Sequence, residues 1–419
     1  MKVTKPAVLA TVAVLAFSAC STTPGATLNK ALQIAVDLPF QGADKASSDP
    51  ILDGIRLAVK EAGGKVGDFT VTVPDSAVYD NASASTGAHD PQTGANNMTK
   101  IVANANYVAV IGPLNSGVAK AEIPISNAAG LLQCSPANTN TELTKGAAAK
   151  ALRTKPNNYI RVVTNDAIQG PAAAAYIITA LKKTSVYIID DTEVFGKGIA
   201  DSFEVEFKAR GGNVVKRDAA PKTTQDYVSI MTAAKALNPE SIYFGGVTAT
   251  GGARILLAAQ EAGLGDIPFV GPDGINDGSG ATKDSFLSTV GAIAKNSFST
   301  LAGPGDFEGK ATFDAAYLAE YGRAATGYAG QGYACAQVVL DALKRAIATN
   351  PTTDAALREA VRVAGTDTTV EYTLDVGKVK FDADGDTSQL IVSIYSYDAA
   401  GAGGKGDWKY ETQIDAAIK

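Results

Sequence analysis

The sequence predicts an α/β fold made of two successive doubly wound parallel-sheet domains. Short apolar runs alternate with segments whose apolar residues recur at helical spacing, as in consecutive βαβ units. The alternation fills two stretches that join around residues 159–165 (YIRVVTN). A chain of 419 residues is also long enough for two packed domains. Right-handed βαβ units would place helices on both faces of each sheet.

The first stretch begins with a short apolar run, LQIAV, which is typical of a buried parallel strand. The next segment spaces Ile51, Ile55 and Leu57 on one helical face. The elements predicted for this stretch are strand 32–36, helix 51–61, strand 69–73, helix 93–103, strand 107–111, helix 118–129 and strand 131–134.

The second stretch repeats the alternation. Its predicted elements are helix 166–182, strand 185–190, helix 195–209, strand 213–218, helix 224–236, strand 241–244, helix 250–262 and strand 267–270. Later pieces do not start a third domain: they are an extended segment 298–301, helices 310–321 and 332–348, and strands 371–381 and 390–397. Residues 79–90 (YDNASASTGAHD) are predicted to form a polar surface loop.

Composition excludes several functional classes. The net charge is −6, from 37 basic and 43 acidic residues, and no long Lys/Arg run suggests nucleic-acid binding. One histidine, His89, and three cysteines leave no clustered His/Cys metal site. The turn 382–386 faintly resembles a calcium loop but lacks Gly at its sixth position and Glu at its twelfth. We therefore expect no metal.

Signatures of catalysis and of cofactor binding are missing as well. Gly309-Lys310 lacks the earlier glycine and the following Ser/Thr of a P-loop. Asp201 stands where a dinucleotide loop beginning at Gly196 would need its third glycine. We expect neither an enzyme nor a bound cofactor. Cys134 and Cys335 lie in apolar surroundings and are interpreted as buried free thiols, although the sequence does not decide against a disulfide between them.

The first twenty residues are interpreted as an export signal. Two lysines precede the apolar run 6–19, which is shorter than the ~20 residues that a spanning helix needs. Small residues lead into Cys20 and resemble a bacterial lipobox, although Phe17 stands where Leu is usual. The alternatives are an ordinary cleaved signal and lipidation at Cys20, and we favour lipidation. Residues 21–30 are small and polar, as expected of a flexible tether.

Five segments, taken in order, resemble the periplasmic leucine/isoleucine/valine-binding protein family, the solute-binding components of branched-chain amino acid ABC transporters. They are VAVIGPLNSG (108–117), SPANTNTELT (135–144), QGPAAAAYI (169–177), YFGG (243–246) and FVGPDG (269–274). The likeness runs from Leu32 to about Tyr397.

The resemblance implies a type I periplasmic binding fold, in which two lobes form a clamshell joined by a three-crossing hinge. The crossings would lie near residues 163–166, 298–301 and 388–391. The first lobe would then comprise residues 31–164 plus 299–389, and the second 165–298 plus 390–419. The late helices would complete the first lobe.

The resemblance also implies a ligand site. Ser116 begins a helix at the carboxyl edge of the first sheet, where it would cap the helix or, as in the family, bind the ligand α-carboxylate beside free backbone N–H groups. Ala137 and Thr139 would supply a backbone carbonyl and a hydroxyl at the same edge. Asp273 would pair with the ligand ammonium, although the family usually has Glu there. Phe195 would line the ligand from the second lobe or pack in the core.

The departures from the family fall in the pocket for the ligand side chain. Ser47 and Val247 stand where tyrosines are common. His89 and Asn115 stand where some members place a disulfide, so His89 is interpreted as a loop residue. The anchors for an α-amino acid are retained, and the identity of the side chain is left open.

We therefore expect an exported, lipid-anchored solute-binding protein, located in the periplasm or at the cell surface. It would bind a branched-chain or related amino acid and deliver it to the permease and ATPase subunits of an ABC transporter. Its contact with the membrane would be through the lipid anchor alone. Two alternatives stay open: a sensory clamshell, and the same fold binding an amide, urea-like or aromatic acid ligand.

Overall fold

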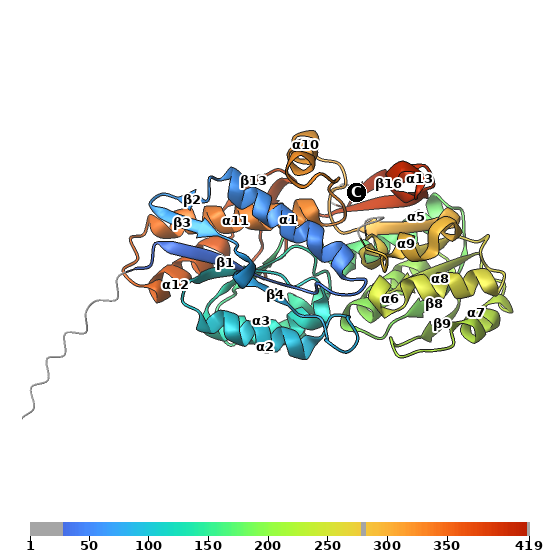
Figure 1. Cartoon of the computed structure of the whole chain (residues 1–419). Coiled ribbons are helices and arrows are strands. Elements are labelled where there is room, and N and C mark those ends of the chain that lie inside the picture. Colours follow the sequence, from blue (N-terminus) through green and yellow to red (C-terminus); the bar gives the residue numbers. More distant parts are fainter. Residues whose placement is uncertain (1–27, 278–281, 417–419) are drawn as a thin grey trace, which may run out of the picture.

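A computed structural model of the chain describes residues 28–277 and 282–416. The described residues form two α/β lobes that lie side by side (Figure 1). Each lobe is built on a sheet whose central strands are parallel, so the predicted fold class is confirmed. The predicted export signal, Cys20 and most of the tether lie outside the described residues.

The sheet of the first lobe is parallel except at one edge. Its central strands are the short apolar runs of the sequence, and all five residues of YVAVI are buried. The strand order is β2 (Lys65–Val66), β3 (Phe69–Thr72), β1 (Ala31–Leu38), β5 (Tyr107–Ile111), β6 (Leu132–Ser135) and β7 (Tyr159–Arg161), with β4 (Val78–Asp80) also paired to β1. Only β2 runs antiparallel to its neighbour.

The sheet of the second lobe combines a parallel block with an antiparallel edge. Its order is β16 (Asp407–Asp415), β15 (Ile391–Asp398), β12 (Ser297–Leu301), β11 (Phe269–Gly271), β10 (Ser241–Gly245), β8 (Ser185–Asp190) and β9 (Asn213–Ala219). β8 to β12 pair in parallel, whereas β15 and β16 are antiparallel. The chain therefore returns to this sheet after it has left it.

Helices cover both faces of the first sheet in Figure 1, with α1 and α11 on one side and α2 and α3 on the other. The helices of the early stretch are α1 (Lys45–Glu61), α2 (Pro91–Ala103), α3 (Ser116–Ala129) and α4 (Gly146–Ala151). The second lobe carries α5 (Asp166–Thr179), α6 (Val194–Ala209), α7 (Tyr227–Lys235), α8 (Gly252–Glu261) and α9 (Phe286–Val290).

Three late helices belong to the first lobe. They are α10 (Lys310–Tyr321), α11 (Ala329–Ile347) and α12 (Asp354–Gly365), and their apolar faces join the core that β1, β5 and β6 form. α11 packs closely on α1, because a Cβ added at Gly54 would lie 2.1 Å from the carbonyl oxygen of Ala329. The chain thus crosses between the lobes three times: before α5, after β12 and before β15.

Several predicted elements differ from the structure. The predicted strand 371–381 is a hairpin, β13 (Glu371–Leu374) and β14 (Gly377–Lys380), whose turn places Gly377 at φ +98°. α1 begins six residues before the predicted helix, in a polar segment that shows no apolar periodicity. α12 and β16 were not predicted. The segment 79–90 is a surface loop at its exposed centre, Ala84–Thr86, whereas Asn81, Ala82 and His89 on either side are buried.

The two internal cysteines form a disulfide, so the interpretation as free thiols is wrong. Cys134 on β6 and Cys335 on α11 have Cα atoms 5.9 Å apart, and both are fully buried. Their separation of 201 residues joins the early and late parts of the first lobe.

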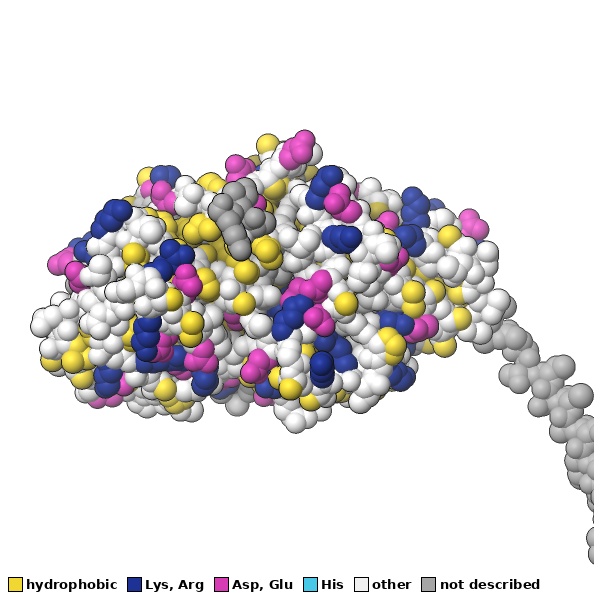
Figure 2. All heavy atoms as spheres, turned by 180° about the vertical axis from the view of Figure 1, so that it is seen from behind, with side chains coloured by type: hydrophobic (Ala, Val, Ile, Leu, Met, Phe, Trp, Pro, Cys, Tyr) yellow, Lys and Arg dark blue, Asp and Glu magenta, His cyan; other side chains and the backbone are white. Residues whose placement is uncertain are grey.

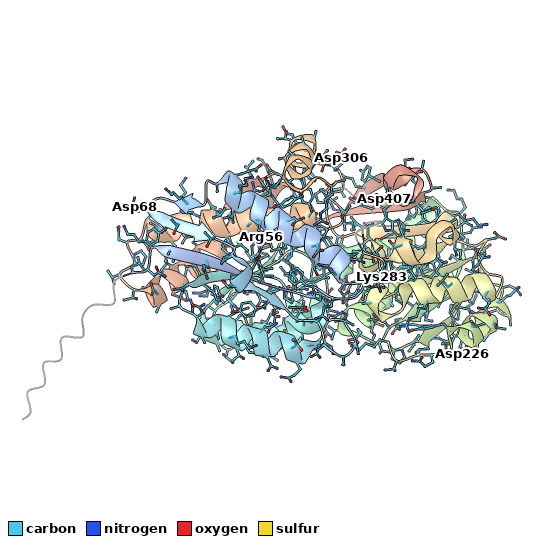
Figure 3. All side chains as sticks on the ribbon, in the orientation of Figure 1. Arg56, Asp68, Asp226, Lys283, Asp306 and Asp407 are labelled. Carbon is cyan, nitrogen blue, oxygen red and sulfur yellow. A yellow bond between two sulfur atoms is a disulfide. The ribbon has the colours of Figure 1, made fainter. Side chains whose placement is uncertain are left out.

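The outer surface carries charges of both signs. Figure 2 shows Lys/Arg and Asp/Glu side chains interspersed over one face of the molecule. Asp68 and Asp226 lie at opposite ends, on the first and second lobes (Figure 3). Within the part of the chain that the structure describes, no helix is long and apolar enough to cross a bilayer.

We expect the Cys134–Cys335 bond to stabilise the first lobe. Cys335→Ala, compared with the wild type in urea unfolding, should lower the free energy of unfolding by about 2–5 kcal/mol, because the open chain regains conformational entropy. Alkylation of the denatured, unreduced wild type followed by peptide mass spectrometry should label neither cysteine. Labelling of both would show that the bond does not form.

Candidate functional site

A cavity lies between the lobes at the carboxyl ends of the parallel strands, the edge where open α/β sheets bind ligands. Its volume is about 30 Å³, and it is lined by Asp44, Ser47, Leu114, Asn115, Ser116, Ala137, Phe195, Val247, Asp273, Gly274 and Tyr328. Four of the five predicted site residues are therefore brought together here, and Thr139 is not among the lining residues.

Ser116 is the first residue of α3 and faces the cavity from the first lobe. It is not the helix cap: that position belongs to Asn115, whose side chain accepts no capping hydrogen bond. The Ser116 hydroxyl oxygen accepts a hydrogen bond from the backbone N–H of Asn140 at 3.3 Å, which leaves its proton available to donate. An uncapped helix N-terminus with an adjacent hydroxyl donor favours an anion.

The turn between β5 and α3 needs glycine at its start. Gly112 has φ +130°, and a Cβ there would lie 2.2 Å from the carbonyl oxygen of Asp37 on β1. This close approach sets the chain that leads to Leu114, Asn115 and Ser116 against the sheet edge.

The loop after β6 is held by side chains that bond its backbone. The Ser135 hydroxyl accepts from the N–H groups of Ala137 at 3.3 Å and Asn138 at 2.8 Å. The Asn138 amide donates to the carbonyl of Leu114 at 2.8 Å, which joins this loop to the β5–α3 turn. Ala137 is therefore positioned beside Ser116 by a fixed backbone.

Arg161 supports the same loop from beneath and is fully buried. Its guanidinium donates to the carbonyls of Asn138 at 3.1 Å and Asn140 at 2.8 Å. It also donates to Asp386 at 2.7 Å. Burial alone would raise the pKa of Asp386, but the charge of Arg161 lowers it below the usual value. The ion pair with Asp386 thus allows the charged guanidinium of Arg161 to lie buried beneath the site.

Asp273 faces the cavity from the second lobe, directly after β11. Gln169 on α5 donates to one carboxylate oxygen at 2.6 Å, and the Tyr328 hydroxyl donates to the other at 2.8 Å. Burial raises the pKa of Asp273 to about 6, against these hydrogen bonds, which lower it. The group is therefore ionised at neutral pH and held from both lobes.

A second buried carboxyl, Asp166, begins α5. Its carboxyl lies beside the buried hydroxyl of Thr139, an interaction that lowers the pKa of Asp166. Burial, followed by the charge of Asp273, raises the pKa of Asp166 to about 8. Asp166 is thus mostly protonated at neutral pH, which leaves Asp273 as the charged group.

The remaining walls of the cavity are formed by Phe195, Ser47 and Val247, which were predicted to lie in the pocket, and by Tyr328, which was not. Phe195 combines both predicted roles, since it lines the cavity and packs in the core of the second lobe. Ser47 and Val247, where the resembling family has tyrosines, also line it. Tyr328 was not predicted, because it lies in an irregular segment before α11, remote in sequence from the other site residues.

His89 lies in the loop between β4 and α2, as predicted, but its side chain is buried and paired, which was not predicted. His89 is buried and its Nδ1 lies 2.8 Å from Asp44 Oδ2, which also accepts from the His89 backbone N–H at 3.1 Å. Burial lowers the pKa of His89, but the charge and hydrogen bond of Asp44 outweigh burial and raise it above the usual value. Asp44 itself lines the cavity and was missed, because a single polar residue before a helix carries no distinctive signal.

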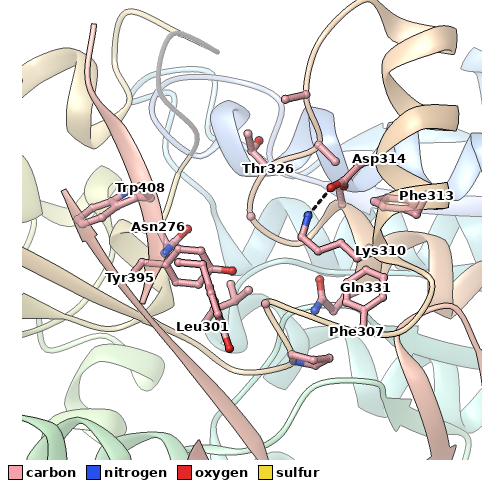
Figure 4. Close-up of a pocket in the computed structure, with 18 of the residues that line it drawn as sticks. Asn276, Leu301, Phe307, Lys310, Phe313, Asp314, Thr326, Gln331, Tyr395 and Trp408 are labelled. Carbon is pink, nitrogen blue, oxygen red and sulfur yellow. Dashed lines mark hydrogen bonds and ion pairs between the residues drawn. The ribbon is translucent and has the colours of Figure 1, made fainter. Parts of the chain in front are cut away.

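A larger cavity of about 240 Å³ lies elsewhere, between the α10–α11 region and the edge strands β15 and β16 (Figure 4). Aromatic rings form part of its wall, and the Lys310 ammonium that reaches it is paired with Asp314 at 2.5 Å. None of the predicted site residues lines it. The smaller cavity, which Ser116, Ala137, Phe195 and Asp273 line together, is therefore the candidate site.

The acidic turn 382–386 does not behave as a calcium loop. Lys145 lies within 3.5 Å of the carboxylates of Asp382, Asp384 and Asp386 and so provides their counter-charge. Among the described residues, no group of three or more His, Cys, Asp or Glu side chains is arranged to hold a metal.

Comparison with known proteins gives consistent matches. The sequence model of a family described as periplasmic binding protein matches residues 31–404. A Leu/Ile/Val-binding protein from Rhizobium johnstonii is 29% identical over 375 residues, which cover 88% of this chain and 92% of that protein.

Solved structures share the fold. A leucine-binding protein from Thermotoga maritima superposes with a TM-score of 0.76 at 23% identity, covering 92% of this chain and 99% of that one. A solute-binding protein of an ABC transporter from R. palustris, solved with benzoate, has a TM-score of 0.72 at 20% identity, covering 91% and 96%.

Proposed function

Because the chain belongs to the periplasmic binding protein family, we propose that it binds an α-amino acid between its lobes and delivers it to an ABC transporter. The observation that carries the proposal is that one side of the cavity favours a negatively charged group and the other side favours a positively charged one. An uncapped helix N-terminus with Ser116 lies on the first lobe, and the carboxylate of Asp273 lies on the second.

An α-amino acid headgroup matches both ends. Its carboxylate would accept from the Ser116 hydroxyl and the α3 backbone, and its ammonium would donate to Asp273. The buried Thr139 hydroxyl and the Ala137 carbonyl lie in the loop beside this headgroup and would accept its remaining protons. An aromatic acid without an ammonium group would leave the Asp273 carboxylate buried without a counter-charge, which disfavours that ligand class.

Binding would work by lobe closure rather than by covalent chemistry. The cavity of about 30 Å³ has room for roughly two water molecules, so the lobes must part to admit an amino acid. A ligand that contacts both lobes binds the closed arrangement better than the open one and shifts the population towards it. The closed complex would then be the form that the permease and its ATPase partner recognise.

We infer that the mature protein works outside the cytoplasm. The short apolar leader and the small residues before Cys20 support export followed by lipidation of that cysteine, with residues 21–30 as the tether. We place the first lobe at 31–164 plus 299–389 and the second at 165–298 plus 390–419, except that residues 299–301 pair in the second sheet as the end of β12.

Asp273→Ala should weaken binding of the cognate amino acid far more than Ser116→Ala. Removing one partner of a buried charge pair costs about 2–5 kcal/mol, or roughly 30- to 4,000-fold in Kd. Ser116→Ala loses one hydroxyl but keeps the backbone donors. Calorimetry would measure both, with Asp266→Ala, an exposed aspartate of the same lobe, as the control. Binding by Asp273→Ala within threefold of wild type would contradict the ammonium assignment.

Binding should also weaken in acid. The ammonium needs an ionised Asp273, whose pKa burial raises to about 6, so protons compete with the ligand below that pH. The apparent Kd should rise towards tenfold per pH unit below pH 6. Titrations of Asp273→Asn over the same range isolate this group from His89. An equal slope in both proteins would assign the effect to another residue.

Cys20→Ser should release the protein from the membrane. If Cys20 carries a lipid, the wild type will fractionate with membranes and the variant will be soluble, since the described residues offer no spanning helix. Immunoblots of the two fractions provide the measurement. Equal solubility of the two proteins would favour an ordinary cleaved signal.

A further inference from the structure

Beyond the headgroup anchors, the first lobe presents polar acceptors to the cavity. Asp44, Ser47 and Asn115 line it, and the exposed fractions of Asp44 and Asn115 are 5% and 7%. These side chains come from the start of α1 and from the residue that precedes α3. They occupy the region into which a ligand side chain would extend once Ser116 and Asp273 hold the headgroup.

Two of these acceptors are incompletely bonded. Asp44 occupies the N-cap position of α1, but its side chain makes no capping hydrogen bond. Both hydrogen bonds of its carboxylate, to the backbone N–H and the ring of His89, are made by Oδ2. Its Oδ1 receives no hydrogen bond from a described residue. Asn115 Oδ1 is buried and likewise lacks a donor among the described residues.

The pair formed by Asp44 and His89 is internally balanced in charge when His89 is protonated. It is enclosed from the second lobe too, where Glu193 and Lys222 are close enough to influence His89 and pair with each other at 3.2 Å. At this end of the cavity the ligand therefore needs to donate a hydrogen bond, and it does not need to carry a charge.

An aliphatic ligand side chain would supply no hydrogen-bond donor to these acceptors. Leaving one buried acceptor without a donor typically costs about 5- to 150-fold in affinity. Sites built to hydrogen-bond a ligand group discriminate strongly against isosteres that lack it. Leu114, Phe195 and Val247 close the cavity around these acceptors and limit the length of what can enter.

We propose that Asp44 and Asn115 select an amino acid whose short side chain carries a neutral hydrogen-bond donor, a hydroxyl or a carboxamide, over the branched aliphatic amino acids. The proposal rests on the proposed binding of an α-amino acid in this cavity. It assigns the specificity of the site to the side-chain end, which Ser116 and Asp273 do not reach.

Near-isosteric pairs test the proposal directly. Calorimetry of the full-length protein with threonine against valine, and with asparagine against leucine, compares side chains of similar shape that differ in donors. We expect the polar member of at least one pair to bind at least tenfold more tightly. Alanine serves as a probe of the headgroup alone, and lysine as a probe of a charged donor.

Variants link the preference to the named residues. The polar-to-aliphatic ratio should fall towards one in Asp44→Ala and decrease in Asn115→Ala. The Asn115 side chain makes no hydrogen bond with a described residue, so its truncation should be tolerated by the fold. Asp49→Asn, on α1 but outside the cavity and paired with Lys45, should keep the wild-type ratio.

The outcomes distinguish failure of the specificity proposal from failure of the proposed function. If alanine binds but valine and leucine bind as tightly as their polar isosteres, the specificity proposal fails and the proposed function stands. Tighter binding of lysine than of every neutral ligand overturns the neutral class, and an unchanged ratio in both cavity variants overturns the assignment to Asp44 and Asn115. If no amino acid binds, alanine included, the proposed function fails and the specificity proposal falls with it.

Discussion

The buried guanidinium of Arg161 is the constraint on which the site and the hinge both depend. A charge with no exposed surface must be matched by fixed acceptors, because desolvation would otherwise cost several kcal/mol. Asp386, Thr144 and the carbonyls of Asn138 and Asn140 supply them. One side chain at the end of β7 therefore determines the shape of the loop that carries Ala137 and Thr139.

The same ion pair also joins two of the three crossings. Asp386, which precedes the third crossing, accepts a further hydrogen bond at 3.2 Å from Asn165, the cap of α5 at the first crossing. The first-lobe half of the candidate site and the base of the hinge are thus built as one unit. The second-lobe half, centred on Asp273, connects to that unit through Gln169 and Tyr328, contacts that can exchange for ligand contacts when the lobes move.

Local pattern predicted much of this architecture. Strand 107–111 and strand 185–190 match β5 and β8 in full, because buried parallel strands are continuous apolar runs bounded by turn residues. Ser116, Ala137 and Asp273 could be placed because each follows such a strand at the sheet edge where ligands bind. The motifs around them resemble those of a known family, which supplied roles that the residues alone could not.

What could not be predicted depends on contacts between distant segments. β16 and α12 do carry local signals that were overlooked, namely the strict alternation DWKYETQID and the spacing of Leu357 and Val361 on one helical face. The Asp44–His89 pair joins residues 45 positions apart, and the disulfide joins residues 201 positions apart. Neither leaves a trace in local periodicity, so the free-thiol interpretation was wrong and the buried pairing of the loop histidine was not predicted.

The late helices that complete the first lobe have a consequence for the order of folding. Tyr317 on α10 donates to Asp53 on α1 at 2.9 Å, a contact that spans 264 residues. The core around α1 and β1 therefore cannot close until more than three quarters of the chain has been synthesised, and the sheet of the second lobe receives its edge strands β15 and β16 later still. Non-local contacts of this kind slow folding. A nascent chain whose N-terminal half lacks its partners stays open longer, and an export machinery that threads unfolded polypeptide would have that interval in which to engage it.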